Sequence, residues 1–296
     1  MPECLKIHME KPGLYTSIQD LGRIGFQDAG IPFSGAMDKE SHKIANELVG
    51  NPHHYPTLEI TQIGPEIRFE GTGQIALTGA DMAAELNGKS IRRYETIDIK
   101  NNDHLILNQS RLGCRTYLAV RGQWQTELWL NSHSAVSNLS SVEGIPKPLK
   151  ALQCIEVSTP NFIPQRIYPE HLRPVFSSCY VLRVVTGPEF EQFGIEQIQS
   201  FFESVFTVSP DSNRMGYRLN GTLENYSTLR EEISSGIVPG TVQITKSGQP
   251  IILTADAQTT GGYPRLANVI EEDLSIVGQM KAGDEVKFML VGLPDL

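Results

Sequence analysis

Residues 250–264 have the sequence PIILTADAQTTGGYP. It starts with an apolar run of strand length that ends in Asp256. Two threonines, a double glycine and Tyr263 follow. A strand that ends in small hydrogen-bonding residues lets a rigid scaffold present a site to solvent, and glycines permit a positive φ or a close approach to a ligand. We therefore expect a β-strand that leads into a binding or catalytic segment.

A weaker copy of this pattern lies earlier in the chain, where IALTGAD at residues 75–81 matches IILTAD at residues 251–256. Three further landmarks keep the same order in both halves: an opening alternating strand, an upstream Glu-Ile pair and a downstream apolar strand (residues 5–7, 59–61 and 102–107 against 182–184, 232–234 and 283–288). The agreement of order and spacing favours a duplication, with two related β units near 5–107 and 182–290 joined by residues 108–181. The alternative is chance similarity between short strands rich in Ile, Leu and Val.

Short apolar runs dominate the chain, and turn residues recur at roughly 8–12 positions, which is typical of a β sandwich or barrel. Two segments depart from this pattern and are predicted to be helical. In residues 37–49 the apolar side chains fall on one helical face, Ser34 or Asp38 can cap the start, and Gly50 follows the end. In residues 190–206 a row of Phe and Ile side chains predicts a shorter helix. We expect a mainly β fold with a few short helices.

The Pro-rich segment 160–174 predicts a linker between the two halves. We therefore place an N-terminal β unit with its connecting segment at residues 1–165. A C-terminal β unit follows at residues 175–296.

The composition is that of a globular protein: of 296 residues, 40% are hydrophobic and 20% are charged. The formal net charge of −9 argues against nucleic acid as a partner. No apolar stretch reaches the roughly 18 residues that a membrane span needs, and the N-terminus lacks the basic and apolar regions of a signal peptide. The 4 cysteines form no C-x-x-C pair. We expect a cytoplasmic protein with free thiols.

Two candidate motifs lie near the N-terminus. In QDLGRIG, residues 19–25, Asp20 and Arg23 can form an ion pair that pins a loop, or with Gln19 they can bind a carboxylate or phosphate through the Arg fork. In GIPFSGAMD, residues 30–38, a Ser34-Gly turn opens the predicted helix that begins near Asp38. The helix start is either an anion site or an ordinary capped terminus.

Two further motifs lie in the C-terminal half. DSNRMGYRL at residues 211–219 places two arginines four apart, where they could clamp a planar carboxylate or carbamoyl group, or belong to a solvated turn. Asp256 could act as an acid or base, although a cap or turn role is commoner for an Asp at a strand end. Candidate site residues in this half are Arg214, Arg218 and Asp256 for catalysis, and Asn213, Gln243, Thr259, Thr260, Gly261, Gly262 and Tyr263 for substrate binding.

Several motifs are missing from the sequence. It contains no P-loop, no dinucleotide fingerprint, no H-E-x-x-H and no G-x-S-x-G elbow. His53 and His54 stand side by side in a predicted loop, so no metal site is indicated. The chain therefore does not look like a self-sufficient catalyst.

At these residues the chain resembles the bacterial KipA family, also called allophanate hydrolase subunit 2 or the biotin-dependent carboxyltransferase-like family. Its best characterised members are the C subunits of the bacterial ATP-dependent 5-oxoprolinase. The matching runs are YTSIQDLGR (15–23), SGAMD (34–38), ANELVGN (45–51), LEI (58–60), SNRMG (212–216) and ADAQTTGGYP (255–264). The resemblance implies two related cyclophilin-like β-barrel units.

The resemblance also implies a function that depends on partners. It implies a KipI-like partner, the B subunit, and a lactam-hydrolase partner, the A subunit, which together with this chain use ATP to cleave 5-oxo-L-proline to L-glutamate. This chain would bind no cofactor alone and would be inactive alone. The catalytic residues Asp256, Arg214 and Arg218, with the substrate-binding residues Gln19, Asp20, Arg23, Ser34, Asp38, Asn213, Gln243 and 259–263, would line a polar cleft that faces the KipI-like partner.

Two alternatives remain open. The chain could be a non-catalytic antagonist of a KipI-like inhibitor of a histidine kinase. It could also be the carboxyltransferase component of a biotin-dependent, urea carboxylase-like system, with biotin on another protein because this chain has no Met-Lys-Met acceptor. A face left without its partner would make homo-oligomers plausible for the isolated chain.

The middle of the chain departs from the family pattern. RGQ at 121–123 stands where the family has Gly-Gly, NSHS at 131–134 replaces a Gly-Ser turn, and KPLKALQ at 147–153 replaces Gly-Arg-x-Leu and Gly-Asp signals. If these loops shape the substrate cleft, specificity has shifted or activity has weakened.

Overall fold

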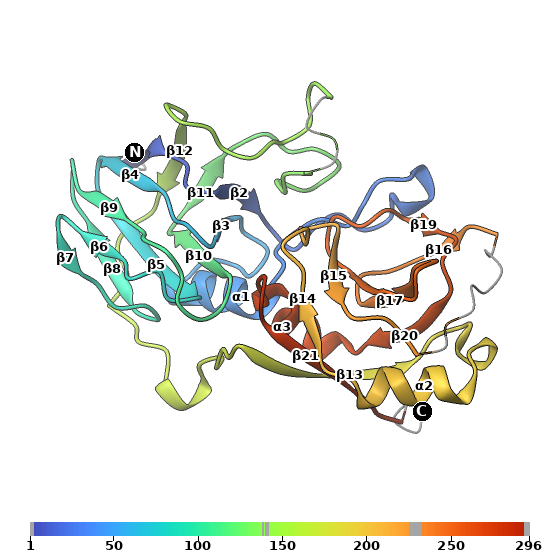
Figure 1. Cartoon of the computed structure of the whole chain (residues 1–296). Coiled ribbons are helices and arrows are strands. Elements are labelled where there is room, and N and C mark those ends of the chain that lie inside the picture. Colours follow the sequence, from blue (N-terminus) through green and yellow to red (C-terminus); the bar gives the residue numbers. More distant parts are fainter. Residues whose placement is uncertain (1–2, 138, 140–141, 225, 227–232, 293–296) are drawn as a thin grey trace. The chain divides into compact units, whose positions relative to one another are not determined.

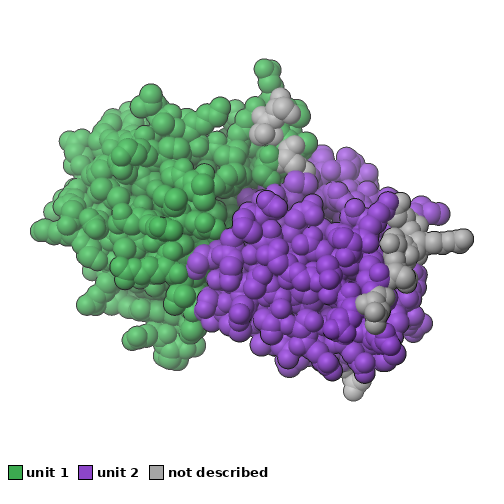
Figure 2. All heavy atoms as spheres, viewed as in Figure 1, with its two compact units in different colours: residues 1–23, 34–176 green, residues 24–33, 177–296 purple. Residues whose placement is uncertain are grey.

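The structure is a computed structural model that describes the whole chain except residues 1–2, 138, 140–141, 225, 227–232 and 293–296. The described part is mainly β, as predicted, and contains three α-helices, of which the sequence predicted two (Figure 1). Two compact units are present (Figure 2). Unit 1 contains residues 1–23 and 34–176, and unit 2 contains residues 24–33 and 177–296. No helix in the described residues is long and apolar enough to cross a membrane.

Unit 1 is built from two antiparallel sheets. The seven-stranded sheet consists of β11 (Gln123–Gln125), β12 (Cys154–Thr159), β1 (Glu3–Lys11), β4 (Glu66–Glu70), β9 (His104–Ile106), β6 (Glu85–Leu86) and β7 (Lys89–Ser90), in that spatial order. The five-stranded sheet consists of β2 (Tyr15–Gln19), β3 (Thr57–Thr61), β10 (Arg115–Val120), β5 (Gly73–Gly79) and β8 (Thr96–Ile99), in that spatial order.

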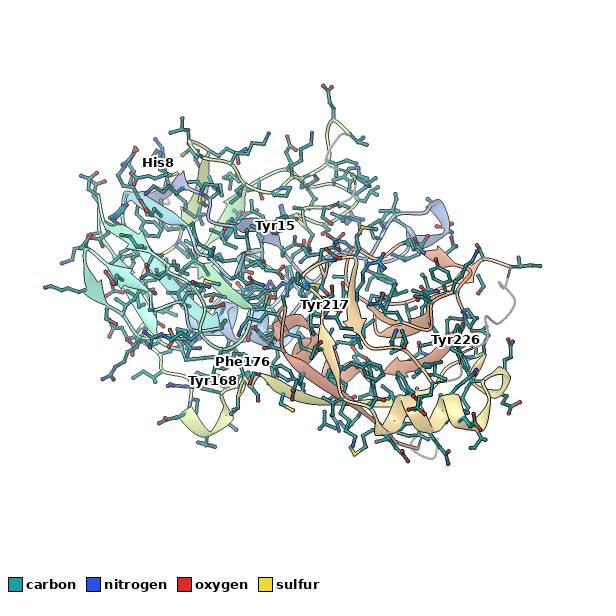
Figure 3. The ribbon with its side chains drawn as sticks, in the orientation of Figure 1. His8, Tyr15, Tyr168, Phe176, Tyr217 and Tyr226 are labelled. Carbon is teal, nitrogen blue, oxygen red and sulfur yellow. The ribbon has the colours of Figure 1, made fainter. Side chains whose placement is uncertain are left out.

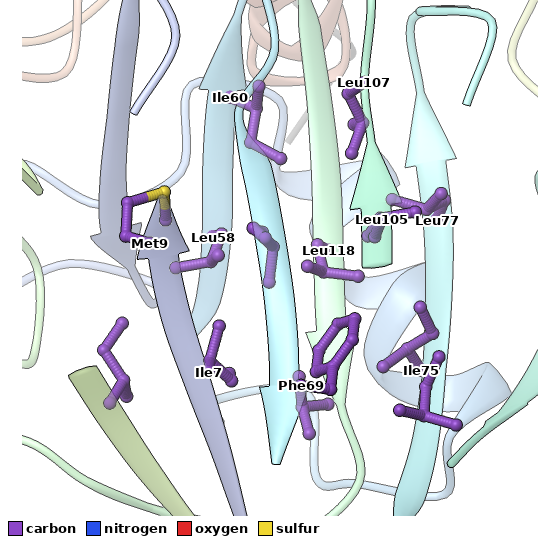
Figure 4. Close-up of a cluster of buried hydrophobic side chains, with 14 of the residues drawn as sticks. Ile7, Met9, Leu58, Ile60, Phe69, Ile75, Leu77, Leu105, Leu107 and Leu118 are labelled. Atoms are coloured by element: carbon purple, nitrogen blue, oxygen red, sulfur yellow. The ribbon is translucent and has the colours of Figure 1, made fainter. Parts of the chain in front are cut away.

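Apolar side chains from both sheets form one core (Figure 4). Ile7 and Phe69 come from the seven-stranded sheet, whereas Leu58, Ile75 and Leu118 come from the five-stranded sheet. Alternate side chains of a strand point to opposite faces, so each sheet contributes every second residue to this core. Unit 1 is therefore a two-layered sandwich over which further elements can pack.

Helix α1 (Lys39–Leu48) packs against the outer face of the five-stranded sheet. Its Ala45 and Leu48 join Tyr117 and Ala119 of β10 in a second core, while Leu118 points into the first core. Because β10 is covered on both faces, all of its residues are buried. The Asp38 side chain caps the helix by accepting a hydrogen bond from the Ser41 amide at 2.9 Å, which confirms one of the two predicted caps.

Unit 2 is organised around a closed seven-stranded barrel. Its strands are β13 (Cys179–Thr186), β20 (Arg265–Val269), β17 (Thr241–Ile244), β18 (Pro250–Leu253), β15 (Gly216–Asn220), β14 (Phe206–Val208) and β21 (Glu285–Leu290), in that spatial order. A separate ribbon pairs β16 (Ser235–Gly236) with β19 (Thr260–Gly261). The remaining helices are α2 (Ile195–Glu203), α3 (Leu274–Gln279) and the 3-10 turns Gln27–Ala29, Glu170–Leu172, Phe190–Gln192 and Glu271–Asp273.

Aromatic packing joins α2 to the barrel. The ring of Phe201 stacks on Phe288 of β21 at 4.4 Å between ring centroids, and Phe206 of β14 completes the cluster. The helix predicted over residues 190–206 is shorter and is preceded by a 3-10 turn, because the chain is extended at Phe193 and Gly194.

The closed barrel of unit 2 fits the prediction for the C-terminal half, whereas the described strands of unit 1 form two sheets and no second closed barrel is seen there. Strand pairing also differs between the proposed repeats. Strand β13 lies parallel to β21, but its proposed counterpart β1 pairs with β4 and β12 within the described chain, not with β9. Glu232 of one landmark lies outside the described residues. The pairing therefore gives no support to a duplication.

The predicted linker at residues 160–174 is instead bound to unit 1. Gln74 exchanges two hydrogen bonds with the backbone of Ile163, both at 2.9 Å. A backbone hydrogen bond of 2.9 Å joins Thr96 to Arg166, and another of 2.9 Å joins Tyr94 to Tyr168. Figure 3 labels Tyr168. Prolines break regular structure without preventing such contacts, so the composition indicated the absence of helix and strand but not the docking.

Candidate functional site

Asp20 lies directly after β2 and joins two segments that are far apart in the sequence. Its Oδ1 accepts hydrogen bonds from the Gly22 amide at 2.8 Å, the Ser132 hydroxyl at 2.7 Å and the Ser134 hydroxyl at 2.6 Å. Its Oδ2 accepts from the His133 amide at 2.7 Å. The carboxylate is therefore engaged by the chain itself, and we call residues 17–23 and 129–135, which meet at it, the Asp20 hub.

The hub holds a tight turn in an unusual conformation. Trp129 and Ser132 exchange two backbone hydrogen bonds at 3.0 and 3.1 Å, and both central residues have positive φ, 50° at Leu130 and 61° at Asn131. This is a type I′ turn, which Asn tolerates and Leu does not favour. A left-handed conformation costs a residue such as leucine roughly 1–2 kcal/mol, so the contacts to Asp20 hold this turn against local strain.

Gln19 and Arg23 also bind residues 129–135. The Arg23 guanidinium donates to the carbonyl oxygen of Ser134 at 2.6 Å and lies 4.7 Å from the ring centre of Trp129. The Gln19 amide nitrogen donates to the Ala135 carbonyl oxygen at 3.3 Å. Both side chains are almost completely buried. The structure thus brings these predicted residues together, and loop pinning is the role that the contacts show.

The turn at Ser34 and Gly35 packs closely against residues 20–22. Gly35 has a φ of 85°, and a Cβ on it would lie 2.6 Å from the Gly22 amide nitrogen. The Ala36 amide donates to the Asp20 carbonyl oxygen at 2.8 Å. Ser34 is buried and also has a positive φ, 54°. The backbone approach explains why a glycine stands at position 35.

The start of α1 already binds an anion that the chain itself supplies. The carboxylate of Glu59, on β3, accepts from the Met37 amide at 2.8 Å and from the Tyr117 hydroxyl at 2.7 Å. Tyr117 in turn accepts from the Asp38 amide at 2.7 Å, and Arg115 lies 3.4 Å from Glu59. Of the two interpretations of this helix start, the capped terminus is correct, because Glu59 and Asp38 occupy it.

Glu59 and Tyr117 were missed as site residues by sequence reasoning. Burial, and then the negative charges of Glu59 and Asp38, raise the pKa of Tyr117 well above its ordinary value, so its hydroxyl stays a proton donor. The available signal was Glu59 itself, a charged residue between Leu58 and Ile60 in an apolar strand. A charge in such a position needs a partner, although the sequence does not say which one.

In unit 2, Arg214 and Asp256 form a buried ion pair with two hydrogen bonds, Nε to Oδ2 at 2.9 Å and a terminal nitrogen to Oδ1 at 3.1 Å. The Asp256 amide donates to the Arg214 carbonyl oxygen at 2.8 Å, and the Thr254 hydroxyl donates to the same oxygen at 2.6 Å. Arg214 is 4% exposed and Asp256 is 0% exposed. The ion pair therefore joins the turn before β15 to the segment after β18.

Arg218 is the more accessible of the two predicted arginines. It lies on β15 opposite Ile251 with its side chain exposed, and no described residue forms an ion pair with it. Its backbone exchanges hydrogen bonds with the Ser212 hydroxyl at 3.2 and 3.3 Å. Asn213 caps the preceding turn by accepting from the Met215 amide at 2.8 Å. These bonds therefore fix the Arg218 backbone, while its side chain is exposed and can contact a ligand.

Gln243, on strand β17 of the barrel, contacts the segment 259–263. The Gln243 amide nitrogen donates to the Tyr263 carbonyl oxygen at 3.3 Å, and a Cβ on Gly261 would lie 2.7 Å from that nitrogen. The Thr259 carbonyl oxygen accepts from the Ile237 amide at 3.0 Å. Thr260 and Tyr263 are exposed and Gly262 is half-buried. The segment thus presents hydroxyl groups to solvent from a backbone that Gln243 supports.

One of the three departures from the family pattern touches predicted site residues. Ser132, His133 and Ser134 are the partners of Asp20. By contrast, Arg121 donates to the Val49 carbonyl oxygen at 2.8 Å, at the end of α1, and to the Asn161 carbonyl oxygen at 2.9 Å. The segment 147–153 bonds to the backbones of β1 and β2. Any change of specificity is therefore expected at residues 131–134.

Glu10, Glu66 and His104 lie close together on the outer face of the seven-stranded sheet, with ligand atoms within 4.8 Å of one another. His104 Nε2 lies 2.8 Å from Glu10, and Lys11 donates to Glu66 at 2.6 Å. Basic partners within a cluster are typical of a surface ion-pair network. We assign no metal site to it.

The chain is similar to a known protein family, to curated proteins and to solved structures. A model of the carboxyltransferase domain, subdomains A and B, matches residues 29–290. The chain is 35% identical to the C subunit of 5-oxoprolinase from Escherichia coli K12 over 96% of its own length and 91% of that protein. It is 33% identical to urea amidolyase of Lachancea kluyveri over 94% of its own length and 16% of that protein. The crystal structure of Kluyveromyces lactis urea carboxylase matches with a TM-score of 0.91 and 30% identity, over 97% of this chain and 27% of that one.

Proposed function

The chain belongs to the family of carboxyltransferase domains with subdomains A and B, and on this premise we propose that it is the C subunit of an ATP-dependent 5-oxoprolinase. In this function it assembles with a KipI-like B subunit and a lactam-hydrolase A subunit in the cytoplasm. The complex cleaves 5-oxo-L-proline to L-glutamate. This chain holds the substrate or its activated form, and it is inactive without its partners.

The observation that carries the proposal is the similarity to a named subunit. The chain is 35% identical to the C subunit of 5-oxoprolinase from Escherichia coli, and the alignment covers 96% of this chain and 91% of that protein. The alignments with a urea amidolyase and a urea carboxylase cover 16% and 27% of those proteins. Because the Escherichia coli relative is named as one subunit of an enzyme, we expect this chain to work with partner subunits.

The contacts of the candidate residues support the following proposed roles. Arg218 binds an anionic group of the substrate, because its guanidinium is exposed on a rigid strand. Asp256 holds Arg214 and thereby fixes the loop that precedes β15, so we assign this pair a positioning role. Gln19, Asp20, Arg23, Ser34 and Asp38 form a second polar group in unit 1. The remaining proposed binding residues are Asn213, Gln243 and 259–263.

The proposal is tested by omission. The chain is mixed with its cognate A and B subunits, and ATP-dependent release of glutamate from 5-oxoproline is measured with and without it. Activity is expected to vanish on omission. Unchanged activity on omission contradicts the proposal, and tight binding to the KipI-like partner without any effect on turnover would favour the role of an antagonist of a KipI-like inhibitor.

The assigned role of Arg218 is tested in the same complex. Arg218→Ala is expected to raise KM for 5-oxoproline about 10- to 100-fold, since a charge-assisted hydrogen bond contributes about 1.5–3 kcal/mol. Its melting temperature is expected to stay close to the wild-type value because the side chain is exposed. Lys287→Ala removes another exposed cation of the same barrel and serves as the control. Equal KM values for wild type and Arg218→Ala remove Arg218 from the site.

A second candidate is the carboxyltransferase component of a biotin-dependent system. The match to the urea carboxylase crystal structure favours it, with a TM-score of 0.91. In this case biotin arrives on another protein. Carboxybiotin-dependent carboxylation of urea, measured with the same purified proteins, distinguishes this function from lactam cleavage.

A further inference from the structure

Arg121 and Arg166 bring two guanidinium groups together at the end of α1. A Cβ on Gly50, which follows the helix, would lie 2.8 Å from Nη1 of Arg121 and 3.8 Å from Nη1 of Arg166, so the two groups flank this glycine. The backbone of each arginine is held in place. The Arg121 amide donates to the Gln74 carbonyl oxygen at 2.8 Å, and the Arg166 amide donates to the Thr96 hydroxyl at 3.1 Å.

Both guanidiniums donate only to neutral carbonyl oxygens within the described chain. Arg121 donates from Nε to the Asn161 carbonyl oxygen at 2.9 Å and from Nη1 to the Val49 carbonyl oxygen at 2.8 Å. Arg166 donates from Nη1 to the Glu47 carbonyl oxygen at 2.8 Å. A guanidinium has five N–H donors. Each arginine therefore keeps donors that can bind a further group.

Neither arginine forms an ion pair with a described residue. Burial lowers the pKa of Arg121, and the positive charge of the neighbouring Arg166 lowers it further. A helix C-terminus carries only about half a negative charge. Capping of α1 therefore explains where the two side chains lie, but it leaves about one positive charge or more without a counterion. Two partly desolvated like charges repel each other, and an anion that binds both relieves this repulsion.

We propose that Arg121 and Arg166 form a binding site for a phosphate group at the end of α1. Near neutral pH a phosphate group carries a charge of about −1.5 to −2 and offers several acceptor oxygens, so it matches two guanidiniums better than one carboxylate does. The site belongs to unit 1 alone and does not depend on the proposed function. Arg121 stands where the family pattern has Gly-Gly, so the site is a property of this chain and not of the pattern.

Phosphate binding to the full chain tests the site directly. The Kd for inorganic phosphate is measured by isothermal titration calorimetry, and sodium chloride keeps the ionic strength constant so that screening does not change. We expect one phosphate per chain with a Kd of about 0.1–1 mM, as for a few charge-assisted hydrogen bonds at a partly exposed site. Arg166→Gln and Arg121→Gln are each expected to weaken binding about tenfold or more.

A matched variant controls for the loss of a positive charge. Arg92→Gln removes another exposed arginine of unit 1 and is expected to leave the Kd within about twofold of wild type. The Arg166 side chain is exposed, so Arg166→Gln is expected to fold, which circular dichroism checks. If Arg121→Gln does not fold, Arg166→Gln decides the inference. An unchanged Kd in folded Arg166→Gln overturns the inference, and so does the absence of saturable phosphate binding by wild type.

Titrations with ADP and L-glutamate identify the chemistry and the source of the ligand. Tighter binding of ADP than of inorganic phosphate, with the same loss in Arg166→Gln, supports the site and identifies a nucleotide phosphate as its ligand. Weaker binding of ADP supports the site and identifies free phosphate. L-glutamate that binds more tightly than both overturns the inference, because a carboxylate is then the better match. These titrations use the chain without partner subunits, so their result does not depend on cleavage of 5-oxoproline.

Discussion

Asp20 and Asp256 show how burial changes what a carboxylate can do. Both follow the end of a strand, and both were expected to contact the substrate. Asp20 accepts four hydrogen bonds from residues of its own unit, and Asp256 forms a two-point contact with Arg214. Carboxylates whose oxygens accept several hydrogen bonds from the chain itself act as anchors between segments. The pinning role of the Asp20 loop was among the alternatives that the sequence left open, whereas the pairing of Arg214 with Asp256 was not foreseen.

His42 makes a prediction about pH at the same scale. Burial lowers its pKa from 6.5 to about 4, although a hydrogen bond to the His53 carbonyl oxygen opposes this effect. Between pH 6.5 and 4 the unfolded chain binds a proton that the folded chain does not, so the stability that the neutral ring provides is lost as pH falls through this range. The loss is on the order of 3 kcal/mol.

Urea unfolding at pH 7 and pH 4 checks this prediction. The free energy of unfolding of wild type is expected to fall more steeply over this range than that of His42→Gln, whose amide cannot be protonated. His171→Gln serves as the control because His171 is exposed. Parallel losses in wild type and His42→Gln would show that another group carries the pH dependence.

At the scale of elements, the alternation of side chains between the two faces of a strand explains most of the strands. It does not explain the turn at residues 129–132. Strand β10 places alternate residues in two different cores, so it reads as continuously buried. The turn at 129–132 carries Leu130 at a φ of 50°, a choice that propensity does not favour. Local sequence could not predict this turn because its geometry is held by Asp20, which lies more than a hundred residues away in the sequence.

Leu130→Asn tests the strain in this turn. Because Asn tolerates a positive φ, the substitution is expected to raise the free energy of unfolding by about 0.5–1 kcal/mol. Leu128→Asn, at a neighbouring residue that is 60% exposed, is expected to change it by less than about 0.5 kcal/mol. Urea unfolding measures both variants. A loss of stability in Leu130→Asn alone would show that packing of the leucine outweighs the strain.

At the scale of the whole molecule, the boundary between the halves is the main question. The contacts divide the chain after residue 176 and assign residues 24–33 to unit 2. The proposed domains 1–165 and 175–296 stay a prediction about independent folding. The Pro-rich segment between them follows unit 1, with Arg166 and Tyr168 bonded to Thr96 and Tyr94.

Two fragments test the importance of this segment. A fragment of residues 1–165 lacks the backbone bonds of Arg166 and Tyr168, and each such bond contributes about 0.5–1.5 kcal/mol. It is therefore expected to be less stable than a fragment of residues 1–176, by about 1–3 kcal/mol in urea unfolding. A 1–176 fragment with Gly and Ser at residues 166–174 separates the contacts from chain length. Equal stability of all three fragments would mean that the segment is a linker after all.

The sequence by itself determined the strand-rich character, a helix near residues 37–49 with Ser34 or Asp38 as its cap, and the motifs that place the chain in its family. Each of these depends on residues that are neighbours along the chain, because periodicity, capping and motif spacing are local properties. Only the tertiary structure decided that Glu59 fills the start of α1, that Asp20 holds residues 132–134, and that β13 runs parallel to β21. Buried charges and strand partners are chosen by long-range packing, and a linear pattern does not record which distant group will meet them.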